Sequence, residues 1–308
     1  MSDSLFALKT FLILTGVAVV LLLAPEAGAH ATDDSVKTTE VEPLTIVHSG
    51  VYAENDYTIE LLRLVLQRAG NQYQLQALGY WPPRGRDFAM MESKDGIDIM
   101  WGSARQDRED RFLTIRIPLF KGLIGWRIPF VHESKLNLFE DVSDLSALSN
   151  YRPGQYFSWT DTRILKHNGI DVFEANNRPR LVDMLVNHKF DYFPRAAIEI
   201  MHEYQQHQHQ GVRIEPHLLI IYPTAFYYYV QKDNQALADN LKLGLETIIA
   251  NGEMDALFFQ HFGEILKTLA IHKRKVIRLD NPFIPPKAPF ERKDLWLQPE
   301  QFTANSVE

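Results

Sequence analysis

The chain has 308 residues and a formal net charge of −7, and it contains no cysteine. The lack of cysteine excludes disulfides, thiol catalysis and cysteine-ligated zinc. An acidic chain without a stripe of lysine and arginine lacks the attraction that dominates nucleic-acid binding, so we expect no nucleic-acid partner. A chain of this length usually divides into two cores, which predicts two domains or lobes.

Residues 1–31 are typical of a secretory signal peptide. Lys9 precedes an apolar run from Phe11 to Ala24, and small residues ending at Ala29 or Ala31 follow it. The run is shorter than the ~20 residues that a bilayer-spanning helix needs. We therefore expect removal of residues 1–31 on export and a periplasmic protein; an uncleaved N-terminal anchor is the alternative. The polar residues 32–41 are expected to form a leader.

Strand-like and helix-like segments alternate in the first part of the fold. The apolar patterns predict strands at 44–48, 73–78 and 97–101 and helices at 57–66 and 88–92. The resulting β-α-β-α-β order predicts an α/β fold with a mostly parallel sheet covered on both faces. Ligands bind beyond the C-terminal ends of the strands in such sheets, so candidate ligand residues follow each strand.

The middle of the chain repeats this order. Strands are expected at 151–157, 170–174 and 190–193, and helices at 160–168, 178–186 and 196–206. The apolar run 218–230 contains Pro223, which favours two strands joined at a crossing over one long strand. Two further helices at 236–251 and 254–269 precede a Pro-rich segment, 273–308, that we expect to be an extended tail.

Several short motifs resemble those of the family 3 periplasmic solute-binding proteins, and they occur in the same order. They are Asp98 to Glu109 with Pro118 to Phe120, Gly154-Gln155 with Trp159 to Thr162, Phe190 to Arg195, Asn251-Gly252, and Leu279 to Pro282. Together they span nearly the whole chain after residue 31 and are similar to substrate-binding proteins of amino-acid ABC transporters. The resemblance implies a two-lobed Venus-flytrap fold of periplasmic-binding type II with two chain crossings between the lobes.

The resemblance also implies how the chain is divided. Lobe 1 would comprise 42–121 and 224–272, and lobe 2 would comprise 123–222. The candidate hinges are Leu119–Leu123 and Tyr222–Ala225, because a few loop residues suffice to absorb the dihedral changes of lobe closure. Gly122 and Pro223 suit this role, although either is also compatible with an ordinary loop.

Arg108 is the first candidate ligand residue. It follows the strand expected at 97–101 and matches the family position whose arginine grips a ligand carboxylate, which a guanidinium holds by two parallel bonds. Ser103 is a candidate for the hydroxyl that the family supplies nearby. The alternative is a solvated helix start on which Arg105, Arg108 and Arg111 are interchangeable.

Arg195 is the second candidate. It follows the strand expected at 190–193, at a point where amino-acid-binding relatives usually carry an acid that holds the ligand ammonium. A second cation in the cleft favours an anionic ligand, such as a dicarboxylate or a phosphate. The alternative is a salt bridge in which Glu199, one helical turn later, neutralises Arg195.

Four further residues complete the predicted site. Tyr52, Trp101 and Trp159 fall near strand ends or in loops, where flat rings commonly line solute clefts, although most aromatic residues belong to the core. Asp161 lies in the matched segment after Trp159. We therefore expect all four to contact the ligand.

The sequence carries no complete catalytic or cofactor motif. His202-Glu203 with His207 resembles a zinc-protease signature, but a spacing of five residues does not place both rings on one helix face. We expect no metal, no cofactor and no enzyme activity. The predicted protein is a monomer that captures a small polar, anionic or amino-acid-like ligand for an ABC-type membrane permease. A ligand sensor feeding a signalling receptor is the alternative, and an enzyme on the same fold is the third possibility.

Overall fold

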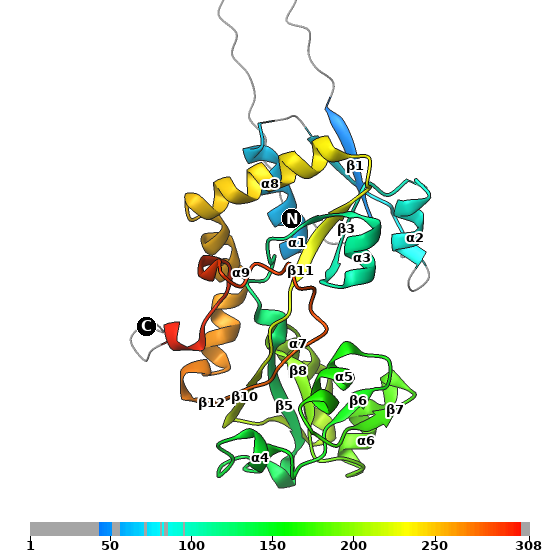
Figure 1. Ribbon diagram of the computed structural model, residues 1–308. Coiled ribbons are helices and arrows are strands. Elements are labelled where there is room, and N and C mark those ends of the chain that lie inside the picture. The colour runs from blue at the N-terminus through cyan, green and yellow to red at the C-terminus, as the bar shows by residue number, and fades with distance from the viewer. Residues whose placement is uncertain are drawn as a thin grey trace, which may run out of the picture. The chain divides into compact units, whose positions relative to one another are not determined.

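The computed structural model describes residues 43–302 apart from 51–55, 71–72, 81, 83–85 and 95. The predicted signal peptide and the candidate Tyr52 lie outside the described residues. Val41–Glu308 form one compact unit. In its described part, two five-stranded β-sheets, one two-stranded sheet and their helices make up this unit (Figure 1).

We define lobe 1 by the sheet of strand order β2-β1-β3-β11-β4 and the helices on it. The strands are β1 (Leu44–His48), β2 (Tyr73–Ala77), β3 (Ile99–Ser103), β4 (Leu113–Ile115) and β11 (Phe226–Val230). The helices are α1 (Tyr57–Arg68), α2 (Arg86–Glu92), α3 (Gln106–Arg111), α8 (Gln235–Ala250) and α9 (Glu253–Thr268). β1 runs parallel to β2 and β3, whereas β11 is antiparallel to β3 and β4.

We define lobe 2 by the sheet of order β12-β10-β5-β8, with β9 beside β5, and by a separate parallel pair β6–β7. The strands are β5 (Trp126–His132), β6 (Gly154–Tyr156), β7 (Phe173–Ala175), β8 (Phe193–Ala196), β9 (Val212–Ile214), β10 (Leu218–Ile221) and β12 (Lys275–Arg278). The helices are α4 (Leu145–Leu148), α5 (Thr160–His167), α6 (Leu181–Val186) and α7 (Ala197–His207).

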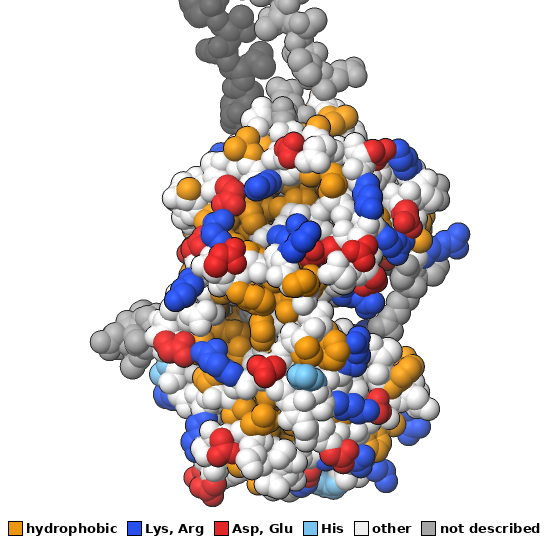
Figure 2. Space-filling view, in the orientation of Figure 1, with side chains coloured by type: hydrophobic (Ala, Val, Ile, Leu, Met, Phe, Trp, Pro, Cys, Tyr) orange, Lys and Arg blue, Asp and Glu red, His pale blue; other side chains and the backbone are white. Residues whose placement is uncertain are grey.

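Short 3-10 turns join these elements: η1 (Leu123–Gly125), η2 (Glu133–Lys135), η3 (Arg178–Arg180), η4 (Gln208–Gln210), η5 (Ile271–Lys273), η6 (Lys293–Leu295) and η7 (Pro299–Gln301). None of the helices in the described part of the chain combines the length and the apolar character that a membrane span requires. Figure 2 shows charged side chains of both signs scattered over one face of the molecule.

Local sequence explains where α1 begins and which face it buries. The side chain of Asp56 accepts a hydrogen bond from the Thr58 amide at 2.9 Å and caps the helix. Leu61, Leu62 and Val65 are fully buried on the face that packs against α8. A β-carbon on Gly244 of α8 would lie 2.0 Å from the carbonyl oxygen of Val65, so glycine allows the two helix backbones to approach closely.

The two expected crossings join the lobes at β4 to β5 and at β10 to β11. The apolar run 218–230 forms two strands in different sheets on either side of Pro223, as predicted. At the crossings the Tyr222 amide donates to the Gly125 carbonyl at 3.2 Å. Gly122 has a φ of 78°, in the left-handed region that favours glycine.

The C-terminal segment differs from the extended tail that we expected. Residues Lys275–Arg278 form β12, which is parallel to β10 in lobe 2. The reason lies in the pairing of Val276 and Ile277 with the buried β10, where Leu219 and Ile220 are fully buried. The preceding helix, α9, packs on α1 and α8 of lobe 1 and also on α7 of lobe 2. Since β12 lies in the lobe 2 sheet, the chain passes from lobe 1 to lobe 2 once more between α9 and β12.

The strand expected at 190–193 is displaced towards the C-terminus. Asp191 and Tyr192 instead lie beside residues 152–154, where the Gly154 amide donates to the Tyr192 carbonyl at 2.9 Å. The chain joins β5 only from Phe193 onward. Arg195 therefore lies inside β8 and is buried, not in the loop after a strand.

Candidate ligand-binding cleft

A cavity of about 720 Å³ is lined by residues from both lobes, both crossings and the C-terminal segment. Its wall in lobe 1 is the end of β3 and the start of α3, and its wall in lobe 2 includes the start of α5 and parts of β5, β8 and α7. The lining residues are Ser103 to Asp107, Ile124, Arg127, Ser158 to Asp161, Arg163, Ile164, Arg178, Arg195, Ala196, Glu199, Tyr222, Thr224, Phe226 and 281–286.

Of the residues predicted to bind ligand, the structure brings four together at this cavity: Ser103, Trp159, Asp161 and Arg195. Arg108 and Trp101 are not among the lining residues. Trp101 lies in lobe 1 with its ring centre 5.8 Å from that of His48 and 6.3 Å from that of Tyr228.

Arg108 turns away from the cavity and contacts the end of β3. Its Nη1 donates to the Ser103 carbonyl at 2.7 Å and to the Ser103 hydroxyl at 3.1 Å. Its guanidinium carbon lies 4.3 Å from the ring centre of Phe88, and burial lowers the pKa of Arg108. The guanidinium therefore orients Ser103 at the cavity wall.

Arg195 is buried and neutralised within lobe 2. Its Nε donates to Glu203 at 2.6 Å and its Nη2 donates to Glu199 at 2.8 Å, so the pairing with Glu199 that we considered as the alternative is present. The guanidinium carbon also lies 5.3 Å from the ring centre of Trp159 and 5.0 Å from that of Phe193. Two carboxylates on the next helix thus offset the positive charge of Arg195.

Arg127 is a cavity residue that the sequence reasoning missed. It is the single charged residue in the otherwise apolar start of β5, and that break in the pattern is the signal that could have revealed it. Its Nη2 lies 2.6 Å from Asp161 Oδ1, and the Tyr222 hydroxyl donates to the same oxygen. Burial opposes the charge of Arg127, but Asp161 and Tyr222 hold its pKa above the ordinary value.

Arg163 and Arg178 also line the cavity, and neither forms an ion pair with any residue that the structure describes. The guanidinium carbon of Arg163 lies 3.9 Å from the ring centre of Phe283, and that of Arg178 lies 5.6 Å from that of Trp159. Arg163 follows β6 in the chain and Arg178 follows β7, and these two strands are parallel. The rule that ligand residues follow strand ends could therefore have found them.

The charge balance of the cavity is positive. Five arginines and three carboxylates line it. Asp107 pairs with Arg105, Asp161 with Arg127, and Glu199 with Arg195. The unbalanced charges are those of Arg163 and Arg178.

In the described part of the chain, no group of three or more histidine, aspartate and glutamate side chains is placed to hold a metal ion. His202 belongs to the incomplete zinc motif, and its Nε2 lies 2.9 Å from the side-chain nitrogen of Gln206.

No protein-family model matches the sequence, and no curated protein sequence matches it significantly. Solved structures do match the fold. One is the probable amino-acid ABC transporter extracellular-binding protein from Bacillus subtilis, with a TM-score of 0.54 and 15% identity over 72% of this chain and 99% of that chain. Another comes from work on glutathione import via GshT and the cystine ABC importer of Streptococcus mutans, with a TM-score of 0.50 and 14% identity over 72% of this chain and 95% of that chain.

These likenesses extend over almost the full length of the matched proteins. The family 3 resemblance expected from the sequence is thus confirmed at the level of fold. The chain has the two-lobed α/β fold of periplasmic solute-binding proteins, of the type found in amino-acid ABC transporters.

Proposed function

We propose that this protein is an exported solute-binding protein that captures a small anionic or amino-acid-like solute in the cleft between its lobes. The observation that carries the proposal is the pair Arg163 and Arg178, two guanidinium groups in a cavity of about 720 Å³ that have no carboxylate partner among the described residues. A solute carboxylate or phosphate would supply the missing charge, and a guanidinium binds either group through two parallel hydrogen bonds.

The other lining residues have distinct roles in this proposal. Ser103 offers its hydroxyl from lobe 1, with Arg108 as the positioning residue behind it. Trp159 offers a flat face beside Arg178. Asp161, held by Arg127, is the acceptor for an ammonium group if the solute is an amino acid. Arg195 forms part of the cleft wall with its charge neutralised, because Glu199 and Glu203 accept hydrogen bonds from its Nε and Nη2.

The proposed lobes are 42–121 with 224–272, and 123–222, to whose sheet β12 is added. The proposed hinges are Leu119–Leu123 and Tyr222–Ala225. The left-handed backbone at Gly122 and the close approach of Gly125 to Tyr222 support the hinge positions. The proposed route begins with cleavage of residues 1–31 and ends with transfer of the solute to an ABC permease by a monomer. A sensor that reports to a receptor would use the same cleft; permease and ATPase genes nearby favour transport, and a kinase or cyclase gene favours sensing.

The test is a ligand screen by thermal shift followed by calorimetry. The panel contains the anions succinate, citrate, L-glutamate, glutathione and inorganic phosphate and the amino acids L-glutamine and L-arginine, with putrescine, a cation without a carboxylate, as the comparison. A solute present at about 100 times its Kd should stabilise the protein by ~2.7 kcal/mol. We expect an anionic or zwitterionic compound to give the largest shift.

Two variants and a matched control locate the binding groups. Arg163→Gln and Arg178→Gln should each weaken binding of the best compound by about tenfold or more, because a charge-assisted hydrogen bond is worth roughly 1.5–3 kcal/mol. Arg180→Gln is the control, since Arg180 is exposed, lies two residues from Arg178 and does not line the cavity. Preferential binding of putrescine, or equal affinity in all three variants, would overturn the proposal.

A further inference from the structure

The segment after β12 returns from lobe 2 to lobe 1 and is fastened on both sides. Its first attachment is to Asn168, the residue that caps the C-terminal end of α5 in lobe 2. The Asn168 side chain donates to the Asp280 carbonyl at 2.8 Å and accepts from the Asp280 amide at 2.9 Å. The next residue, Asn281, donates from its side chain to the Pro223 carbonyl at 2.7 Å. The segment is thus held to lobe 2 and to the second crossing where it enters the cleft.

Two adjacent residues of this segment pack on opposite lobes. Phe283 lies under the Arg163 guanidinium and belongs to the apolar cluster of lobe 2. Ile284 packs on the lobe 1 cluster that contains Phe88 and Tyr229. Both residues line the cavity together with Asn281, Pro282, Pro285 and Pro286. One short stretch of chain therefore bridges the lobes and forms part of the cleft wall.

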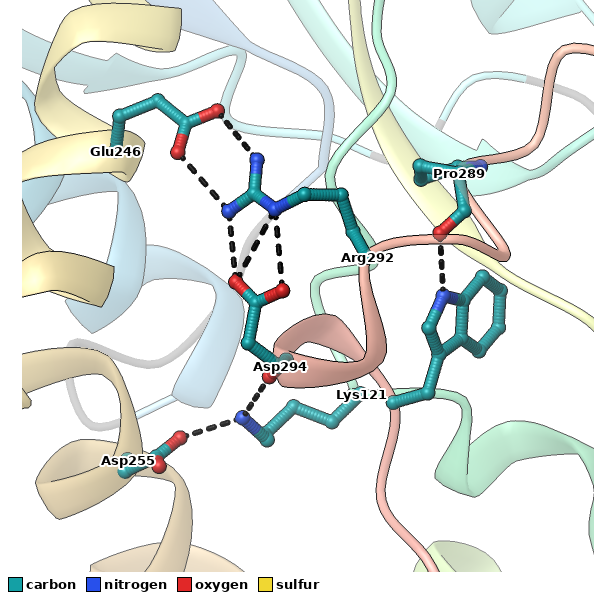
Figure 3. A network of polar contacts seen from close by, with 7 residues as sticks. Lys121, Glu246, Asp255, Pro289, Arg292 and Asp294 are labelled. Atoms are coloured by element: carbon teal, nitrogen blue, oxygen red, sulfur yellow. Dashed lines mark hydrogen bonds and ion pairs between the residues drawn. The ribbon is translucent and has the colours of Figure 1, made fainter.

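The second fastening is to α8 and α9 of lobe 1, and Figure 3 shows its polar contacts. The Arg292 guanidinium contacts Glu246 of α8 at 3.0 Å and Asp294 at 2.7 Å. The buried Lys121 donates to Asp255 of α9 at 2.6 Å and to the Asp294 carbonyl at 2.9 Å. The Leu297 amide also donates to the Lys121 carbonyl at 2.8 Å.

Packing of Trp296 reinforces this fastening. Its indole nitrogen donates to the Pro289 carbonyl at 2.9 Å. Its ring covers Gly122, where a β-carbon would lie 2.8 Å from Trp296 Cε3. The segment is therefore seated on the candidate hinge as well as on α8 and α9.

We propose that residues 280–297 form an interlobe clasp that limits how far the cleft opens and supplies one of its walls. Four prolines at 282, 285, 286 and 289 stiffen the bridge, because each fixes the backbone angle φ. The clasp sets the opening of the cleft in the unliganded protein, so this inference does not depend on the proposed solute capture.

Distances between the lobes without ligand provide the test. The sequence has no cysteine, so Asp110→Cys on α3 and Lys166→Cys on α5 introduce two unique, exposed sites for spin labels. Double electron–electron resonance then measures the distance across the cleft. The clasp is released at lobe 1 by Arg292→Ala with Trp296→Ala. Asn168→Ala removes only the contacts with Asp280, because β12 still joins the segment to the lobe 2 sheet.

The matched control is Arg68→Ala, which breaks a bidentate ion pair with Glu253 of α9 that is about as exposed as the pair of Arg292 with Glu246. We expect longer and more widely distributed distances in the protein released at lobe 1, a smaller change in Asn168→Ala, and an unchanged distribution in the control. If the released proteins unfold, a protease site inserted between the exposed Pro286 and Lys287 allows the clasp to be cut after folding. If the released or cut forms give the same distance distribution as the parent protein, the proposal of a clasp is overturned, whatever the ligand screen shows.

Discussion

The guanidinium carbon of Arg163 lies 3.9 Å from the ring centre of Phe283, although the two residues are far apart in the sequence. Arg163 belongs to α5, and Phe283 belongs to the C-terminal segment that lines the same cavity. The ring face attracts the cation without neutralising it. The aromatic contact therefore orients Arg163 without occupying its hydrogen-bond donors.

A double-mutant cycle measures this contact without ligand. Phe283→Leu and Arg163→Gln, alone and combined, should give a coupling of about 0.5–1 kcal/mol in the free energy of unfolding, the range for cation–π pairs at exposed sites. Urea titrations followed by circular dichroism provide the values. Phe283→Tyr keeps the ring face and should retain the coupling, whereas additive effects of the first two substitutions would show that the contact contributes nothing.

Arg195 should act on stability more than on ligand selection. Its side chain is 7% exposed, and those of Glu199 and Glu203 are 50% and 25% exposed. Replacing Arg195 with Met leaves two neighbouring carboxylates without their cation. After allowance for solvent at the carboxylates, we expect a loss of about 1–3 kcal/mol in the free energy of unfolding.

The control for this substitution is Arg111→Met, which removes an exposed ion pair with Glu92. It should lower the free energy of unfolding by at most ~1 kcal/mol. Adding Glu203→Gln to Arg195→Met should recover part of the lost stability, because one of the uncompensated charges disappears. Equal losses for Arg195→Met and Arg111→Met in denaturant titrations would contradict the buried network.

Gly244→Ala should destabilise lobe 1 even though alanine is the better helix former. The added β-carbon would meet the Val65 carbonyl at 2.0 Å, so α1 and α8 must separate. Overpacking of this kind typically costs 1–3 kcal/mol, about equal to or more than the roughly 1 kcal/mol that alanine gains over glycine in a helix. A lower Tm is the expected result.

Gly263→Ala on α9 is the matched control. The nearest atom to its added β-carbon is Phe259 Cβ at 3.8 Å, an ordinary contact distance. The same measurement should show an unchanged or raised Tm for this variant. A Gly244→Ala protein as stable as Gly263→Ala would mean that α1 and α8 lie further apart than described.

Acid should remove the stabilising contribution of Glu253. Hydrogen bonds from Arg68, and then from Asn251, lower the pKa of Glu253 to about 2. A carboxyl group with a pKa below its unfolded value stabilises the fold at higher pH and loses this effect as pH falls, here from about pH 5 towards pH 2. Thermal unfolding across this range should show a declining Tm.

Arg68→Met identifies the part of the decline that belongs to Glu253. The variant should have a shallower dependence of Tm on pH below about 5, since its Glu253 pKa moves back towards the ordinary value. Arg213→Met, which breaks an exposed pair with Glu133, is the control. Parallel curves for the parent protein and Arg68→Met would rule out the proposed linkage.

The sequence by itself determined the alternation of strands and helices and hence the fold class. The periodic apolar residues of α1, α8 and α9 specify their helices, and Pro223 specifies the break between β10 and β11. These features are local, because they depend on hydrophobic periodicity and backbone restriction within a few residues. The order of the matched motifs added the two-lobed arrangement, which the solved structures share.

Only the tertiary structure decided which arginines in the cleft carry unbalanced charge. Arg108 and Arg195 both occur where the sequence pattern expects ligand residues. In the structure, however, Arg108 donates hydrogen bonds to Ser103, and Glu199 and Glu203 neutralise Arg195. The path of the C-terminal segment was likewise decided by two contacts, that of Asp294 with Lys121 and that of Arg292 with Glu246. Each contact joins residues more than 45 positions apart in the sequence. Charge pairing and chain docking depend on distances between side chains remote in sequence, and local patterns carry no information about those distances.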